Sequence, residues 1–296
     1  MLEKFIGSDI AKDNISTALK FNKIGSAILI CAEEGLGRTY FARLLAADYL
    51  YPDNKIKAEA VINGTSIDVT TILGEGASGQ IKIDIIRELK KNVTTTNIGN
   101  DRRVVIIKDA QMLNEKSSNA LLKVLEEPPK GVLFILCAPS SSSIIITIRS
   151  RCNIYNLSMP SKSLCKEYLL KNYGAKKEDK IDLLNEMWQG NIGICKRHLD
   201  SIKVYNTFLN SLEIVKAIEN VNTYQFMVLF AKHEKNKVDT LELLNNVYHI
   251  LSAKIKEQED IAYIYIVMTE IQNTIFAIKQ NANLKLCITN LATKIQ

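Results

Sequence analysis

The sequence predicts an α/β domain built on a parallel sheet, followed by a part made of helices alone. Up to about residue 157, short apolar runs alternate with helical patterns, whereas amphipathic helical stretches follow one another after Pro160. Strands buried on both faces of a parallel sheet read as unbroken apolar runs, because helices cover both faces. The first apolar run also leads into a glycine-containing loop and a helix, which is typical of a phosphate-binding fold.

Three apolar runs predict buried strands, and two amphipathic segments predict helices that cover them. The strands are expected at Ala27–Cys31, Arg103–Ile107 and Val132–Cys137. The helices are expected at Thr39–Leu50 and through Ala120–Glu126. Pro128 and Pro129 end the second helix, because a proline ring disfavours the helical conformation of the residue before it.

The helical part divides into two domains in our prediction. Amphipathic patterns predict helices at Lys162–Leu170, Lys177–Trp188 and Ile192–Leu199. Gly190 ends the second of these helices, and Asn191 is a favoured N-cap for the third. The predicted organisation is therefore an α/β domain at residues 1–157, a small helical domain at 158–200 and a second helical domain at 201–296.

Composition and hydropathy exclude several classes of protein. Of the 296 residues, 47% are hydrophobic and 24% are charged, which excludes collagen-like, disordered and disulfide-rich chains. Apolar runs such as Val132–Ala138 are far shorter than the roughly 20 residues that cross a bilayer. The first residues, MLEKFIGSDIAKDN, carry charges where a secretory signal needs an apolar segment. We therefore expect a soluble, cytoplasmic protein with no membrane partner.

Net charge does not identify a partner. The sequence has 38 Lys and Arg against 32 Asp and Glu, a formal charge of +6, far below the density of a basic nucleic-acid tail. The basic pairs Lys90-Lys91, Arg102-Arg103 and Lys196-Arg197 nevertheless leave a stand-alone DNA-binding module as one alternative.

The cysteines are expected to be reduced, packed thiols, because none belongs to a C-x-x-C pair and most have apolar neighbours. They are Cys31, Cys137, Cys152, Cys165, Cys195 and Cys287. The histidines, His198, His233 and His249, do not lie near a cysteine cluster. The sequence therefore offers no ligand set for structural zinc, and we expect no metal.

A degenerate phosphate-binding loop follows the first predicted strand, where residues 32–39 read AEEGLGRT. Gly35 and Gly37 would let backbone N–H groups close around phosphate, and Thr39 keeps a hydroxyl suited to magnesium. Arg38 replaces the lysine of the motif, although a planar guanidinium is not equivalent to a compact ammonium in a tight cradle. The loop also has Ala32 in place of the first glycine, and Glu33 and Glu34 oppose an anionic ligand by like charge.

A second degenerate motif follows the strand Arg103–Ile107. An active nucleotide hydrolase presents paired acids there for magnesium and the attacking water, but this chain has Lys108 and Asp109. Two degraded motifs, each at the expected strand end, indicate a fold descended from a nucleotide hydrolase. The alternative is a strand-to-helix turn in which glycine serves only the backbone conformation.

Three later strings carry a more specific signal. Residues 118–129 read SNALLKVLEEPP, residues 134–137 read FILC, and residues 147–152 read TIRSRC. In this order and spacing they resemble the subunits of bacterial clamp loaders, which are AAA+ proteins, and in particular the delta-prime type of the DNA polymerase III clamp loader. The resemblance covers residue 5 to about residue 200, including Phe5–Gly7 and Gly190–Gly193.

The resemblance implies a fold and a function. Residues 1–157 would be an AAA+ P-loop-type domain, residues 158–200 its helical lid, and residues 201–296 a collar that joins subunits. The chain would be a non-hydrolysing subunit of a hetero-oligomer that loads the sliding clamp onto primed DNA during replication. Its partners would be the ATPase (tau/gamma) subunits, the delta subunit, the clamp and, within the complex, DNA.

The resemblance also implies one catalytic residue. Arg151, between Ser150 and Cys152, would point into the ATP site of the neighbouring subunit as an arginine finger. ATP would then be bound by neighbouring subunits rather than by this chain, which is expected to have no ATPase activity or cofactor of its own. By spacing alone, Arg149 and Arg151 are better interpreted as solvated charges beside a strand end, and the resemblance reverses this interpretation for Arg151.

Departures from the ATPase members of the family favour the non-hydrolysing interpretation. Ala138-Pro139 stands where those members carry a polar sensor, and Gly193 stands where they place an arginine. The alternative, an active clamp-loader ATPase, would call for a lysine in place of Arg38 and for paired acids at Lys108 and Asp109.

Two further expectations concern local structure. Many clamp-loader subunits carry four zinc-binding cysteines after the phosphate-loop helix, and since this chain has none there, Pro52–Ser66 is expected to be a shortened connection. The string LLKVLEE can be ordinary amphipathic packing, with Lys123 paired to Glu126 or Glu127 on the exposed side.

Overall fold

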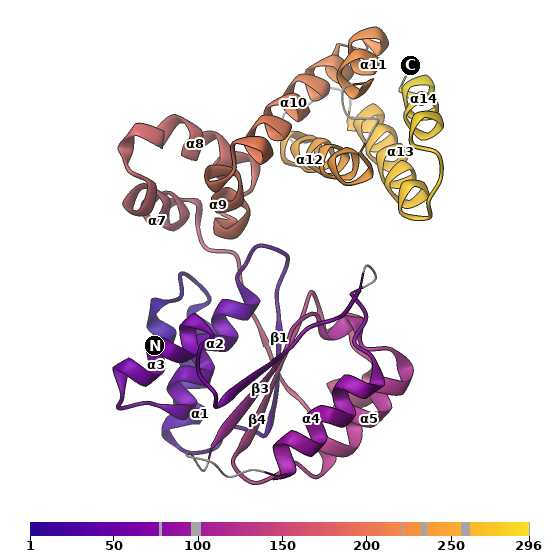
Figure 1. Cartoon of the computed structure of the whole chain (residues 1–296). Helices are drawn as coiled ribbons and strands as arrows, with labels where there is room; N and C mark the ends of the chain where they lie inside the picture. The colour runs from indigo at the N-terminus through magenta and orange to yellow at the C-terminus, as the bar shows by residue number, and fades with distance from the viewer. Residues whose placement is uncertain (77–78, 96–101, 221, 232–235, 256–260, 296) are drawn as a thin grey trace. The chain divides into compact units, whose positions relative to one another are not determined.

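The computed structural model describes residues 1–76, 79–95, 102–220, 222–231, 236–255 and 261–295. The chain forms two compact units, Met1–Leu164 and Cys165–Gln296. The first unit is α/β and the second is helical in its described residues (Figure 1). Within the described ranges, no helix is long and apolar enough to cross a membrane.

One parallel sheet organises the first unit, with the strand order β2-β3-β4-β1-β5. The strands are β1 (Ala27–Cys31), β2 (Val69–Ile72), β3 (Arg103–Ile107), β4 (Val132–Ala138) and β5 (Asn153–Asn156). Ile28 of β1 lies between Ile135 of β4 and Asn153 of β5. All residues of β1 and β4 are buried, as expected for strands covered by helices on both faces.

Two apolar layers sandwich the sheet (Figure 1). One layer contains α1 (Asp9–Lys20), α2 (Arg38–Leu50) and α3 (Lys55–Asn63), and the other contains α4 (Ile83–Thr95), α5 (Glu115–Glu126) and α6 (Ile146–Arg149). Short 3-10 turns are η1 (Leu2–Lys4), η2 (Ala110–Met112) and η3 (Ser141–Ser143). Ile28 and Ile30 of β1 face the first layer and Leu29 faces the second, because side chains alternate along a strand.

The three predicted strands are confirmed, and the structure adds elements that were not predicted, among them β2, β5 and α3. β2 and β5 lie at the sheet edges and are only partly buried, so they lack the unbroken apolar run of a central strand. The connection predicted at Pro52–Ser66 contains helix α3. Asn54 caps that helix by accepting a hydrogen bond from the Lys57 N–H (3.1 Å), and Gly64 ends it in the left-handed region.

The second unit is built from helices around one continuous apolar core. The helices are α7 (Lys162–Tyr173), η4 (Ala175–Lys177), α8 (Glu178–Met187), α9 (Ile192–Asp200), α10 (Ile202–Glu219), α11 (Thr223–Ala231), α12 (Lys237–Lys254), α13 (Ile261–Lys279) and α14 (Leu284–Lys294). The core extends from Cys165 near the start of α7 to Ile295 after α14, and Phe208 and Phe230 are among its largest buried side chains.

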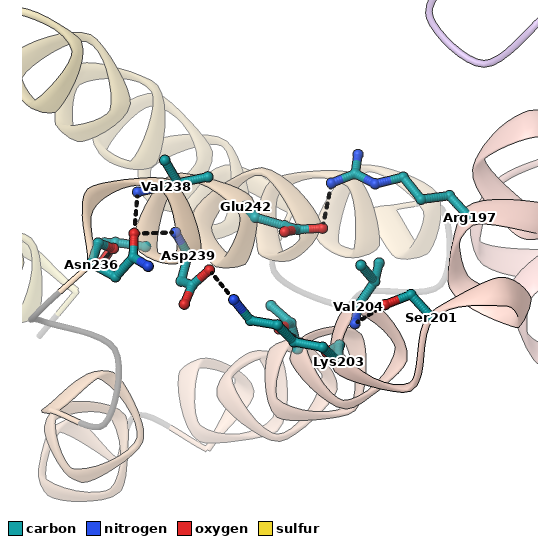
Figure 2. A network of polar contacts seen from close by, with 10 residues as sticks. Arg197, Ser201, Lys203, Val204, Asn236, Val238, Asp239 and Glu242 are labelled. Atoms are coloured by element: carbon teal, nitrogen blue, oxygen red, sulfur yellow. Dashed lines mark hydrogen bonds and ion pairs between the residues drawn. The ribbon is translucent and has the colours of Figure 1, made fainter.

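Ion pairs join α12 to α9 and α10 (Figure 2). Arg197 of α9 contacts Glu242 at 2.6 Å, and Lys203 of α10 contacts Asp239 at 2.9 Å. Ser201, between α9 and α10, caps α10 by accepting a hydrogen bond from the Val204 N–H (3.4 Å). The Arg197–Glu242 pair connects residues on the two sides of position 200, where we predict a domain boundary, whereas Lys203 and Asp239 both follow that position. The three-domain division stays a prediction.

Candidate functional site

The loop after β1 has the backbone shape that its glycines allow. Gly35 and Gly37 have φ values of 84° and 74°, in the left-handed region that residues with a side chain rarely adopt. A Cβ on Gly37 would also lie 3.4 Å from the ring of Phe5. The loop starts at buried Ala32, whose N–H donates to the Ala138 carbonyl at the end of β4 (3.2 Å).

Arg38, the first residue of α2, turns its guanidinium toward its own chain. Nη1 donates to the Ala32 carbonyl (3.1 Å), and Nη2 lies 3.4 Å from Oδ1 of Asp109. The Arg38 side chain is only 16% exposed, against 54% for Asp109. The carboxyl ends of parallel strands meet at one edge of a sheet, and therefore β1 and β3 bring these two residues together across 71 positions of sequence.

The contacts of Arg38 direct its positive charge away from the place where a phosphate-binding loop holds its ligand. A phosphate-binding loop needs a cation directed at the ligand, whereas this cation is directed at a backbone carbonyl and a carboxylate of the same unit. Asp109 also accepts a hydrogen bond from Nε2 of Gln111 (3.3 Å). Glu33 is exposed beside the loop, so a triphosphate would meet negative charge while it displaced Asp109 from Arg38.

Thr39 and Cys137 both lie next to Arg38. Thr39 is the second residue of α2 and is partly buried. The Cys137 thiol of β4 contacts the Arg38 carbonyl, with Sγ donating at 3.8 Å. Burial raises the pKa of Cys137 to about 12, although the positive charge of Arg38 lowers it in part. This thiol is a packed group rather than a nucleophile.

Arg151 lies at the surface, two residues after α6. Its Nη2 contacts Oε1 of Glu126 at 2.6 Å, and its Nη1 donates to the Thr147 carbonyl at 2.8 Å and contacts the Ser150 hydroxyl at 3.4 Å. The Arg151 side chain is 36% exposed. Cys152 is half-buried against the apolar layer under α5, and burial raises the pKa of its thiol to about 12.

The structure thus forms two separate sets of contacts from the predicted residues. Arg38 contacts Asp109 in one set, while Arg151 contacts Ser150 in the other. Sequence reasoning missed Glu126 as the partner of Arg151: the ion pair that the structure describes for Glu126 is with Arg151, not with Lys123. The LLKVLEE and SRC strings were both recognised, but no spacing rule connects a helix end with a loop 25 residues later.

The described residues contain no group of three or more His, Cys, Asp or Glu side chains that could hold a metal ion. His233 lies outside the described residues. The cysteines are free thiols, with Cys31, Cys137, Cys165 and Cys195 buried and Cys152 and Cys287 partly exposed.

The strand order, the glycine loop at the carboxyl end of β1 and the helices that follow define an α/β P-loop-type fold of the AAA+ class. A family model described as "DNA polymerase III, delta subunit" matches residues 7–161, which is more than half of the chain. The chain therefore belongs to this family, and the resemblance to clamp-loader subunits is confirmed.

Individual relatives carry the names of several DNA polymerase III subunits. The chain is 33% identical to subunit gamma of Buchnera aphidicola subsp. Schizaphis graminum over 168 residues, covering 54% of this chain and 46% of that protein. It is 40% identical to subunit delta' of Haemophilus influenzae over 89 residues, covering 30% and 27%. Subunit gamma of Buchnera aphidicola subsp. Acyrthosiphon pisum is 29% identical over 251 residues, covering 80% and 68%.

The chain thus matches less than half of the length of the first two of these relatives. Among solved structures, a DNA polymerase III gamma subunit-related protein from Thermotoga maritima is similar with a TM-score of 0.55 and 19% identity. That match covers 95% of this chain and 98% of the other, and at this identity it supports the fold alone.

Proposed function

We propose that this chain is the non-hydrolysing, delta-prime type of subunit of a DNA polymerase III clamp loader. In this role it acts in the cytoplasm with the tau/gamma ATPase subunits and the delta subunit, and helps place the sliding clamp on primed DNA. The observation that carries the proposal is the pairing of Arg38 with Asp109 and the Ala32 carbonyl. The residues that would hold phosphate and magnesium in an ATPase neutralise one another here.

The first test is ATP hydrolysis by the purified chain. We expect no turnover above background, with or without primed DNA, because Arg38 is committed to the chain and only Asp109 remains of the paired acids. Arg38→Ala is the matched variant, and it is expected to be as inactive as the unmodified chain. DNA-stimulated turnover that Arg38→Ala abolishes would contradict the proposal.

An active ATPase subunit is the second candidate, and one specific observation favours it. The relatives named gamma and tau match up to 83% of this chain, whereas the delta' relative matches 30%. The resemblance implies that tau/gamma subunits are the ATPases of the complex. The same hydrolysis assay decides between the two candidates.

The active role that we propose for the chain is to donate Arg151 to the ATP site of a neighbouring subunit. A guanidinium is always charged and can make two parallel hydrogen bonds to phosphate oxygens. The exposure of Arg151 supports this role, because a surface arginine can reach a second protein. Arginine fingers are worth roughly 10³- to 10⁵-fold in rate in comparable phosphoryl-transfer systems.

The second test is turnover of reconstituted loader complexes that carry Arg151→Ala. We expect the complex to assemble and hydrolysis at the adjacent site to fall, with partial recovery in Arg151→Lys, because an ammonium lacks the planar fork. Arg149→Ala is the control, since Arg149 is a neighbouring arginine at the end of α6. If Arg151→Ala complexes assemble and turn over ATP at the unmodified rate, the subunit does not donate this arginine.

A further inference from the structure

We infer that Glu126 is a positioning residue for Arg151: its carboxylate holds the guanidinium in the orientation in which it meets the neighbouring ATP site. This inference rests on the proposed donation of Arg151. It concerns the contact at 2.6 Å between Oε1 of Glu126 and Nη2 of Arg151.

Both backbones that carry this pair are anchored in the apolar core. Glu126 is the last residue of α5, directly after Val124 and Leu125, which are 4% and 5% exposed. On the other side, Ile148 of α6 is 1% exposed, three residues before Arg151. The two side chains therefore extend from backbone positions that are held in place. Their contact can then fix the orientation of the Arg151 guanidinium.

The Arg151 guanidinium makes contacts through two of its nitrogen atoms, and these contacts do not use all of its N–H donors. Nη1 is occupied by the Thr147 carbonyl and the Ser150 hydroxyl, and Nη2 by Glu126. A guanidinium has five N–H groups, and these contacts use three of them. The remaining N–H groups, on Nε and Nη2, are those with which the fork can bind an external phosphate.

The stability of α5 does not account for a glutamate at this position. The C-terminal end of a helix carries a partial negative charge, so an anion there is disfavoured unless a cation faces it. The Glu126 and Arg151 side chains are 48% and 36% exposed, and pairs in such positions add little to folding stability. What the pair supplies is the orientation of a long side chain that otherwise samples many rotamers.

Glu127 provides a matched control within the same chain. It is the next residue, carries the same carboxylate and is exposed. It lies outside the helix with φ −122° and ψ 69°. The contacts that the structure describes for Arg151 involve Glu126 and not Glu127.

The experiment compares ATP turnover, at varied ATP concentration, in reconstituted complexes with clamp and primed DNA. The variants are Glu126→Ala, Glu126→Gln, Glu127→Ala, Arg151→Ala and the double variant Glu126→Ala/Arg151→Ala. We expect Glu126→Ala to lower kcat about two- to tenfold, the factor that corresponds to the rotamer freedom of one long side chain. KM for ATP, complex assembly and the unfolding temperature of the chain should stay unchanged.

Two comparisons separate positioning from a structural role. Glu126→Gln keeps an oxygen that accepts the same hydrogen bond, and it should recover most of kcat, while Glu127→Ala should match the unmodified complex. The double variant should be no slower than Arg151→Ala alone, because Glu126 acts only through that arginine.

The outcomes also separate this inference from the proposed function. If Arg151→Ala lowers turnover while Glu126→Ala is as fast as the unmodified complex or faster, arginine donation stands and positioning by Glu126 is wrong. If Arg151→Ala itself has no effect, the donation fails and the inference fails with it.

Discussion

Among single residues, Arg38 and Arg151 of the α/β unit show how two identical side chains acquire different contacts from their surroundings. Arg38 is 16% exposed and donates to the Ala32 carbonyl and Asp109, whereas Arg151 is 36% exposed and contacts Glu126, Thr147 and Ser150 at the surface. Both are permanently charged. Their contacts differ because one guanidinium is enclosed at the carboxyl edge of the sheet and the other lies at the surface.

Trp188 and His198 give the helical unit a pH dependence that can be measured. Trp188 is the single tryptophan of the chain, and its ring lies 5.6 Å from that of His198. Burial lowers the pKa of His198 below its ordinary value of 6.5; Arg197 lowers it too, while the Ile194 carbonyl and Glu242 raise it. As the pH falls below about 6.5, the unfolded chain binds a proton that the buried ring does not accept.

We therefore predict that the free energy of unfolding of the helical unit decreases on acidification from about pH 7.5 to about pH 5.5. Trp188 fluorescence during urea unfolding measures it directly. His198→Gln removes the titrating group and should flatten the profile. A profile as steep in His198→Gln as in the unmodified chain would show that other groups cause the dependence.

Among the helices, α12 depends on the cap at its first turn. The Asn236 side chain accepts hydrogen bonds from the backbone N–H groups of Val238 (2.9 Å) and Asp239 (3.4 Å), as Figure 2 shows. These donors have no partner within a helix, so a capping side chain satisfies them. The same helix carries Asp239 and Glu242, which pair with α10 and α9. The cap therefore stabilises the start of a helix that contacts α8, α9, α10 and α13.

We predict that Asn236→Ala lowers the free energy of unfolding of the helical unit by about 1 kcal/mol, the usual loss for a removed N-cap. Urea unfolding followed by Trp188 fluorescence is the measurement. Asn236→Asp retains an acceptor and should stay close to the unmodified chain. Equal losses in the two variants would mean that the side-chain oxygen is not what stabilises α12.

For the molecule as a whole, we expect substitutions in the sheet core of the first unit to lower the free energy of unfolding more than substitutions on its surface. Phe134 in β4 is fully buried between neighbouring strands and the layer that contains α5. Phe134→Ala leaves a cavity in addition to the lost apolar burial, and should cost about 3–5 kcal/mol. Circular dichroism during urea unfolding measures it.

Glu33→Ala serves as the control for Phe134→Ala, because Glu33 is exposed and substitutions at such surface positions change stability by about 0.5 kcal/mol or less. A loss below about 1 kcal/mol in Phe134→Ala would contradict the packing of β4 described here.

The elements that the sequence predicted are those whose pattern is set by burial on both faces. β1, β3 and β4 are unbroken apolar runs because helices cover both sides of the central sheet. β2, β5 and α3 were missed, because short, partly buried elements leave little hydrophobic period to detect. The family was identified from strings of residues rather than from these patterns.

The sequence by itself determined the residue types of the candidate site: a glycine loop with Arg38 instead of lysine, a lone Asp109 and an arginine between Ser150 and Cys152. The tertiary structure decided which of them meet. Arg38 contacts Asp109 across 71 residues because parallel strands end at one edge, and Glu126 contacts Arg151 across 25 residues because α5 packs against α6. Such contacts depend on how distant elements pack, which no local pattern encodes.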